Sequence, residues 1–125
     1  MGQLLSIVEI GGYPDFATLY KSKGLQVETA NSMRKALKIL KKSKPDIVVA
    51  EFNFQSDFRD RTSSLESLMA TIQGCHTRVI VFYEKEQRPQ LERLLSVFDV
   101  YAIISFPVDG AELEKTIDRI QQETA

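Results

Sequence analysis

Apolar positions follow two different periods along this chain, and the two periods alternate. Short, mostly apolar runs rich in β-branched residues indicate strands at 4–10, 25–29, 46–52, 79–83 and 101–104. Apolar residues spaced three and four apart indicate helices over 16–20, 33–40, 65–72, 91–98 and 113–120. The pattern therefore predicts five strands that alternate with five helices.

The strand runs predict different depths within the sheet. Residues 47–50 are apolar without interruption, which is typical of a central parallel strand covered on both faces. Leu25, Val27 and Thr29 instead alternate with polar residues, which is typical of a half-exposed strand. We therefore expect the second strand to lie at the edge of the sheet.

Residues that favour helix starts support the helical segments. Asn31 or Ser32 can cap the second helix, because a short side-chain oxygen accepts a bond from a free backbone N–H. Asp109 followed by Glu112 resembles a capping box at the start of the last helix. These signals separate the helices from the strands that precede them.

Strands and helices in strict alternation favour right-handed crossovers and a parallel sheet. We predict a single domain over residues 1–125 with an α/β, doubly wound, flavodoxin-like (βα)5 fold. Its five-stranded sheet should have the order 2-1-3-4-5 between two layers of helices. Ligands and chemistry collect at the carboxyl ends of such strands.

Composition narrows the class of protein without naming a function. The chain has 125 residues, of which 43% are hydrophobic and 26% charged, and its net charge is −1. No segment approaches the roughly 20 apolar residues of a membrane span, and the amino terminus does not look like a secretory leader. We expect a soluble cytoplasmic domain that does not associate with membranes and lacks a global attraction to nucleic acid.

One segment carries a resemblance to a known family. Residues 44–54 read KPDIVVAEFNF, which resembles the Lys-Pro-Asp and hydrophobic run of response regulator receiver (CheY-like) domains. In that family the run ends in the aspartate that accepts phosphate. The resemblance covers nearly the whole chain, and it implies a bacterial two-component signalling module that works through a protein partner.

The positions that carry the family's chemistry differ in this chain. The resemblance places Glu51 at the phosphate-accepting aspartate, and only Glu9 at the pair of acids that hold magnesium. It places Tyr83 at the Thr or Ser that ends the fourth strand, and Phe106 at the lysine before Pro107. We therefore predict a degenerate receiver, or pseudo-receiver, with a cis Phe106–Pro107 bond and with Tyr83 packed on Phe106.

These departures bear directly on phosphorylation. Formation of an acyl phosphate needs a carboxylate of the right reach, a metal ion to shield charge and a cation near the phosphoryl oxygens. All three are compromised here, so we expect no enzymatic activity, no bound metal and no cofactor. Glu51 either imitates the phosphorylated aspartate or is a vestige, and we favour the vestige because no cation stands at Phe106.

Two other functions are left open by the sequence. The first is a phosphotransfer acceptor that uses an unusual acid, Asp57 or Asp46. The second is a nucleic-acid-binding module that uses the basic second helix. The basic residues of that segment are Arg34, Lys35, Lys38, Lys41, Lys42 and Lys44.

A further surface is a candidate for protein contact. The fourth helix, fifth strand and last helix carry both signs of charge, which suits a two-fold contact between identical chains. The residues of this candidate face are Glu92, Arg93, Tyr101, Lys115, Asp118 and Arg119. We expect the partner to be a protein, with a homodimer as one form of that contact.

Overall fold

A computed structural model describes residues 2–8, 16–52 and 64–124 of the chain. The strands are β1 (Gln3–Ile7), β2 (Gln26–Ala30), β3 (Ile47–Glu51), β4 (Arg78–Tyr83) and β5 (Ala102–Ser105). The α-helices are α1 (Ala17–Ser22), α2 (Met33–Lys42), α3 (Ser64–Ile72), α4 (Arg88–Leu95) and α5 (Gly110–Thr124). A 3₁₀ turn, η1 (Lys85–Gln87), precedes α4.

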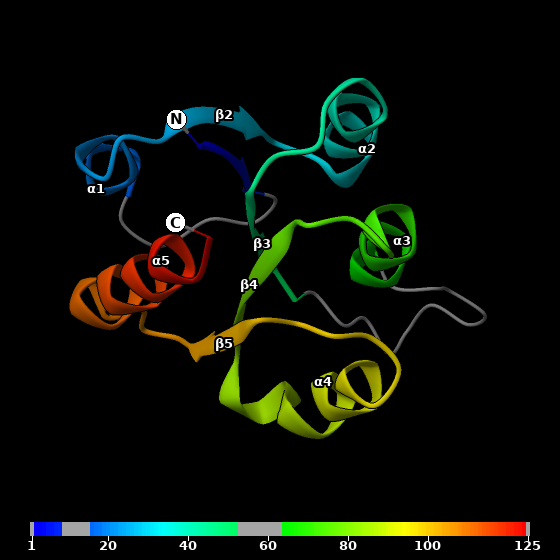
Figure 1. The fold of residues 1–125 in the computed structure, drawn as a ribbon. Coiled ribbons are helices and arrows are strands. Elements are labelled where there is room, and N and C mark those ends of the chain that lie inside the picture. The colour runs from blue at the N-terminus through cyan, green and yellow to red at the C-terminus, as the bar shows by residue number, and fades with distance from the viewer. Residues whose placement is uncertain (1, 9–15, 53–63, 125) are drawn as a thin grey trace.

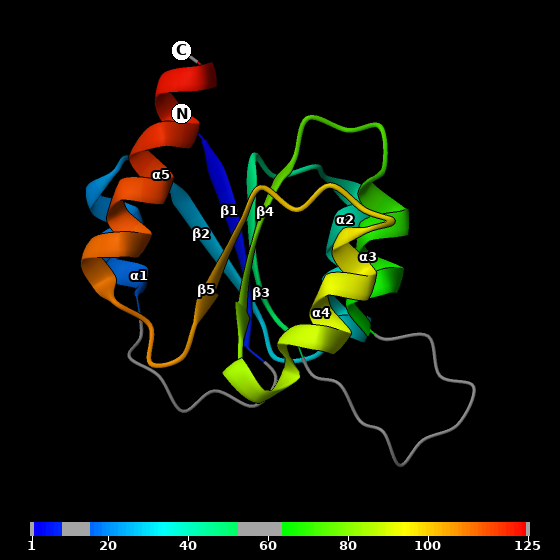
Figure 2. The same ribbon diagram turned by 90° about the horizontal axis from the view of Figure 1, so that it is seen from below.

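All four strand pairings are parallel, and the sheet has the order β2-β1-β3-β4-β5. Helices α1 and α5 cover one face of the sheet, and α2, α3 and α4 cover the other (Figure 1, Figure 2). This arrangement is the predicted flavodoxin-like fold with β2 at an edge. Among the described residues, no helix is both long and apolar enough to span a bilayer.

Two hydrophobic cores lie on the two faces of the sheet, and every residue of β3 is buried between them. Side chains alternate along each strand, so Val48 and Ala50 join the core under α2, α3 and α4. Ile47 and Val49 join the core under α1 and α5. The uninterrupted apolar run predicted as the central strand therefore serves both faces.

Local sequence signals fix the ends of several helices. The Ser32 hydroxyl accepts a hydrogen bond of 3.2 Å from the Lys35 amide, so Ser32 is the cap of α2. Asp109 accepts a 2.9 Å bond from the Ala111 amide at the start of α5. Gly24 follows α1 with a φ of 79°, a backbone conformation that a side chain would strain.

The fourth helix begins and ends earlier in the chain than the apolar spacing predicted. It ends at Leu95, and the amides of Val97 and Phe98 both bond to the Leu94 carbonyl in a closing turn. Phe98 still packs against the core of α2, α3 and α4 from outside the helix. A residue in a closing turn can keep helical spacing in the sequence after the helix has ended, because it covers the same core.

Candidate functional site

The carboxyl ends of the parallel strands lie at the same end of the sheet, and this is where the sequence predicted the site. β3 ends there in Glu51, β4 in Tyr83 and β5 in Ser105. The predicted acid Glu9 and the alternative acceptor Asp57 lie outside the described residues. Glu51 and the strand ends around it are therefore the part of the site that the structure describes.

Glu51 is buried, with only 3% of its surface exposed. Its register partner on β4 is Phe82, which is fully buried. Phe82 belongs to the core under α1 and α5, and strand alternation from Ile47 and Val49 puts Glu51 on that same face. The neighbour of the carboxylate along the sheet is thus an aromatic ring.

Phe82 is the middle of a row of three aromatic rings. Its ring centroid lies 6.4 Å from that of Phe16, before α1, and 6.1 Å from that of Phe106, after β5. The interplanar angles are 72° and 69°, so both contacts are edge-to-face, a favourable arrangement for aromatic pairs. The row packs on the face of the sheet that carries Glu51.

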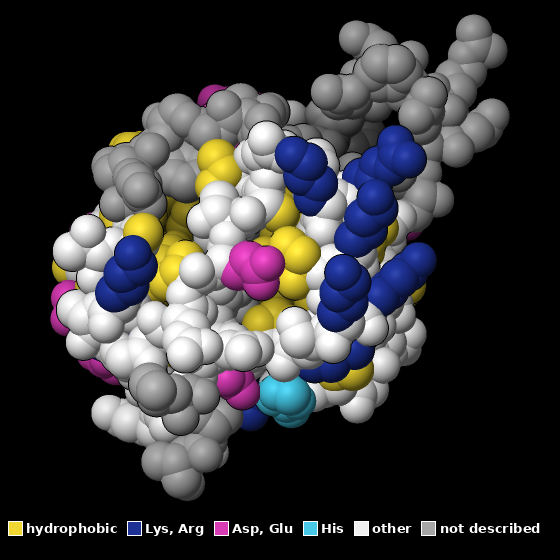
Figure 3. Space-filling view, turned by 90° about the horizontal axis from the view of Figure 1, so that it is seen from above, with side chains coloured by type: hydrophobic (Ala, Val, Ile, Leu, Met, Phe, Trp, Pro, Cys, Tyr) yellow, Lys and Arg dark blue, Asp and Glu magenta, His cyan; other side chains and the backbone are white. Residues whose placement is uncertain are grey.

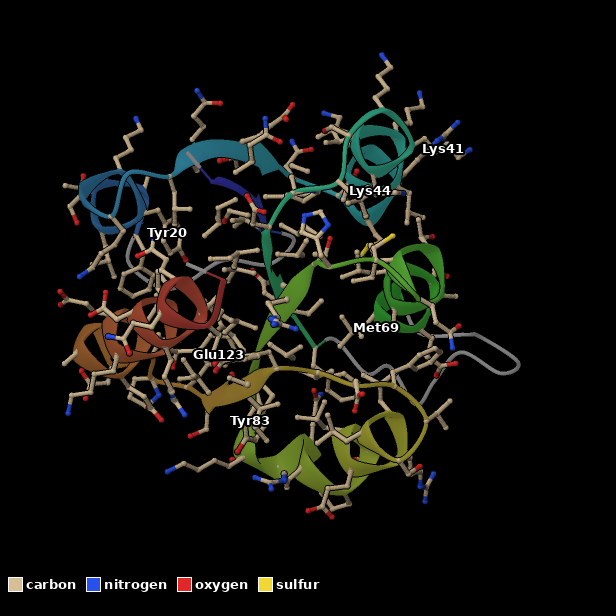
Figure 4. All side chains as sticks on the ribbon, viewed as in Figure 1. Tyr20, Lys41, Lys44, Met69, Tyr83 and Glu123 are labelled. Atoms are coloured by element: carbon tan, nitrogen blue, oxygen red, sulfur yellow. The ribbon has the colours of Figure 1, made fainter. Side chains whose placement is uncertain are left out.

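Tyr83 faces away from this row, and the expected packing of Tyr83 on Phe106 is wrong. Tyr83 belongs to the core under α2, α3 and α4, whereas Phe106 packs against the other core. Arg88 donates a 2.9 Å hydrogen bond from Nη1 to the Tyr83 hydroxyl, and its guanidinium lies 5.6 Å from the ring centroid. Figure 4 labels Tyr83 at this end of β4.

The residue of β4 that shares a face with Glu51 is therefore Phe82, one position before the residue that the sequence indicated. The run 79–83 is apolar throughout, so the sequence holds no alternation that would reveal which residue faces which core. The register of β3 against β4 shows that Phe82 lies on the same face as Glu51. Neither residue at the end of β4 offers the small hydroxyl that the family resemblance calls for.

The end of β5 agrees with the sequence reading in its backbone. The Phe106–Pro107 peptide bond is cis, as predicted. The Phe106 amide donates a 2.9 Å bond to the Tyr83 carbonyl, which ties this turn to the end of β4. The side chain before Pro107 is an aromatic ring packed on Phe82, where the resemblance calls for an ammonium group.

The described part of the site does not fit a magnesium ion. Magnesium needs oxygen ligands in near-octahedral geometry. Among the described residues, no group of three His, Cys, Asp or Glu side chains is arranged to hold a metal. Glu51 lies beside Phe82, which offers no oxygen ligand, so we derive no step through a metal.

Asp46 lies at the opposite end of β3 from Glu51 and is a structural residue. One of its carboxylate oxygens accepts a 2.9 Å bond from the Gln3 amide, and the other lies 3.2 Å from His76 Nε2. A strand rises about 3.3 Å per residue, so Asp46 is roughly 16 Å from Glu51. As an alternative phosphate acceptor it is therefore displaced from the strand ends where the site lies.

Several residues of the candidate contact face already have partners within the chain. Glu92 forms an ion pair with Arg88 on its own helix, with 3.2 Å between Oε1 and Nε. The Tyr101 hydroxyl donates a 2.5 Å bond to Glu123 on α5. Asp118 forms an ion pair of 2.9 Å with Lys23, which follows α1. Self-association through the remaining residues stays a prediction.

Lys23 fastens the end of α1 to α5. Its ammonium group lies 2.8 Å from Glu114 and 2.9 Å from Asp118, and only 18% of its side chain is exposed. Gln121 also donates a 2.8 Å bond to the Lys23 carbonyl. These contacts join residues more than ninety positions apart, so no local sequence pattern predicts them.

We expect the domain to lose stability at alkaline pH. Hydrogen bonds to Glu114 and Asp118 raise the pKa of Lys23 above its ordinary value of 10.5. The bond to Glu123, followed by burial, raises the pKa of Tyr101 above its ordinary value of 10.0. Both groups stabilise the fold fully below those ordinary values, and their contributions are lost as the pH rises through the higher folded values.

Urea unfolding between pH 8 and pH 11.5 measures this effect. Stability should fall above about pH 10, and the fall should be shallower in Lys23→Met and in Tyr101→Phe. Lys115→Met is the matched control, because Lys115 is exposed on α5 and should leave the slope unchanged. Parallel slopes in all four proteins would show that neither group is linked to folding.

Comparison with solved structures places this geometry among known folds. No protein-family model matches the sequence, and no curated protein matches it either. The chain is similar to a response regulator from Desulfuromonas acetoxidans, with a TM-score of 0.74, 16% identity and 100% coverage of both chains. The chain has a receiver-domain fold. Since the identity is so low, this likeness establishes the fold alone.

Two further receiver structures support the same conclusion. A response regulator receiver domain from Clostridium thermocellum has a TM-score of 0.76 and 17% identity, over 99% of this chain and 97% of that one. The chemotaxis protein CheY4 of Vibrio cholerae has a TM-score of 0.73 and 20% identity, over 96% and 98%. All three likenesses therefore establish the same receiver-domain fold.

Proposed function

We propose that this chain is a receiver-like signalling module that is not phosphorylated at its strand-end carboxylate. It acts in a bacterial regulatory pathway in the cytoplasm, without a cofactor and without catalysis of its own. Its signal is carried by contact with a protein partner. The proposal rests on the receiver-domain fold together with the side chains that occupy the site.

The observation that carries the proposal is the surroundings of Glu51. Glu51 is 3% exposed, and its register partner on β4 is the fully buried Phe82. Phe106, which follows β5, packs edge-to-face on Phe82. A phosphoryl group on Glu51 would need space and cationic or hydroxyl partners on the side where these rings lie.

The reach of the carboxylate adds to this effect. Glutamate is one methylene longer than aspartate, and a displacement of about 1 Å can cost roughly a hundredfold in rate. Phe106 stands where the family resemblance calls for the lysine that would receive the charge. We therefore favour Glu51 as a vestige of an acceptor over Glu51 as an imitation of a phosphorylated one.

Treatment with a small phosphodonor tests the proposal. Wild type and Glu51→Asp are incubated with acetyl phosphate and Mg²⁺, and the intact mass of each is measured. We expect neither protein to gain a phosphoryl group, because the aspartate alone restores neither the cation nor the space beside it. A receiver domain with the complete site, treated in parallel, is the positive control.

The possible results separate the alternatives. One phosphoryl group on wild type would overturn the proposal, and mapping it to Asp57 would establish the phosphotransfer alternative. A phosphoryl group on Glu51→Asp alone would show that the aromatic row leaves room for the chemistry. In that case the length of the Glu51 side chain would be the single cause of inactivity.

A further inference from the structure

Helix α2 carries a one-sided row of positive charge, here called the basic stripe. It consists of Arg34, Lys35, Lys38, Lys41 and Lys42, all of them exposed. Figure 3 shows Lys and Arg side chains gathered along one side of the molecule, and Figure 4 shows Lys41 pointing away from the body. Residues 29–45 contain no Asp or Glu.

The stripe is held rigidly by the opposite side of the helix. Met33, Ala36 and Leu40 are buried in the core under α2, α3 and α4. Ser32 caps the start of the helix, and Lys44 Nζ donates a 2.7 Å bond to the Leu40 carbonyl at its end. Lys44 is thus a capping residue, and the five residues of the stripe form a fixed array that faces away from the core.

The stripe has no acidic partner within the described chain. No ion pair reaches its five residues among residues 2–8, 16–52 and 64–124, whereas Lys23 has two and Arg78 and Arg88 have one each elsewhere. Like charges three and four positions apart on a helix destabilise it, and a solvated face of mixed sign would be more stable. An anionic ligand would offset this repulsion.

The distribution of charge favours a compact anionic partner. Outside residues 29–45 the described chain carries eight Lys and Arg against thirteen Asp and Glu, so the net positive charge of the described residues is concentrated in this segment. No aromatic side chain lies within residues 31–45, so nucleic-acid bases have no stacking platform there. The apolar face of α2 is buried, so the helix cannot insert into a bilayer.

We propose that the basic stripe is the docking surface for an acidic helix of a partner protein. Arg34, Lys38 and Lys41 stand four and seven positions apart, about 6 and 10 Å along the helix. Asp or Glu side chains at the same spacing on a partner helix lie at matching distances. This inference rests on the proposed function, since it assigns a surface to the protein contact by which the domain acts.

Binding to a defined probe tests the docking surface. The probe is a fluorescein-labelled Ala-rich helical peptide with Glu at positions i, i+4 and i+7 of two turns, and its control has Gln at those positions. Fluorescence anisotropy at 25 mM salt should show at least tenfold tighter binding of the Glu peptide. Lys38→Glu with Lys41→Glu and Lys42→Glu should weaken that binding at least tenfold.

A charge-matched variant separates a local site from total charge. Lys21→Glu with Lys85→Glu, Gln73→Glu and Gln122→Glu changes the net charge by the same amount, at exposed residues outside α2 and outside the candidate contact face. It should keep binding within about twofold of wild type. Equal losses in the two charge-changed variants, or no difference between the Glu and Gln peptides, would overturn the inference.

Other polyanions are measured under the same conditions. A 20-base-pair duplex DNA and vesicles of phosphatidylserine and phosphatidylcholine should bind more weakly than the Glu peptide, and tighter binding of either would overturn the assignment to a protein. The phosphorylation test does not involve α2. A phosphorylated wild type would therefore reject the proposed function and leave this binding result standing.

Discussion

Phe82→Ala should destabilise the domain by about 3–5 kcal/mol, because it removes a fully buried ring and leaves a cavity that its neighbours fill only in part. The ring also loses its edge-to-face contacts with Phe16 and Phe106. A loss of this size lowers the melting temperature of a domain this long by roughly 10–20 °C. Urea unfolding followed by circular dichroism measures it.

Phe106→Ala is the matched control, since it removes the same side chain from the end of the aromatic row. Phe106 is only partly buried, so its loss should cost about 1–2 kcal/mol. If the two variants were equally destabilised, Phe82 would not be the centre of the row. A loss below about 1 kcal/mol for Phe82→Ala would contradict the closed site beside Glu51.

Leu40→Ala should destabilise the domain by about 2–5 kcal/mol, whereas Lys41→Ala should change its stability by less than about 0.5 kcal/mol. Leu40 is fully buried in the core under α2, α3 and α4, and Lys41 is exposed on the other side of the same helix. The free energy of unfolding in urea gives both values. Both substitutions put Ala in a helix, so intrinsic helix propensity favours neither result.

The two results together separate the roles of the two sides of α2. If Lys41→Ala cost as much as Leu40→Ala, the basic stripe would be part of the structural framework. Its charges would then need no partner to explain them. A small effect at Lys41 leaves binding as the role to be tested.

The fold could be predicted from the sequence because its signals are local and agree with one another. Residues 47–50 require cover on both faces, and the half-polar strand that contains Val27 requires an edge. Crossover handedness then leaves few strand orders. The cap at Ser32 and the buried positions of α2 followed from helical spacing for the same reason.

The candidate site was predicted less completely, because its geometry depends on facing and register. Glu51 was placed correctly at the end of the central strand, but the all-apolar run 79–83 of β4 gives no sign of whether Phe82 or Tyr83 lies on the same face as Glu51. The distant contacts of Lys23 with α5 are set by tertiary packing and carry no local pattern. Contacts of this kind can be identified only from the three-dimensional structure.

The partners of individual charged side chains could likewise not be predicted from the sequence. Asp118 looked like part of a surface of mixed charge, and the structure pairs it with Lys23 instead. Asp46 was an alternative phosphate acceptor in the sequence, but it lies at the opposite end of β3 from Glu51, where it accepts a bond from the Gln3 amide. An acid becomes a candidate for chemistry only where the fold leaves it at the strand ends.

The central claim is that the site beside Glu51 is closed to a phosphoryl group, and titration with a phosphoryl mimic tests it most directly. Wild type labelled with ¹⁵N is titrated with Mg²⁺ and beryllofluoride, which mimics a phosphoryl group on a strand-end carboxylate, and amide shifts are recorded by NMR. We predict no saturable shift at Glu51, Phe82 or Phe106. Saturable shifts at these amides with a single dissociation constant would contradict the claim.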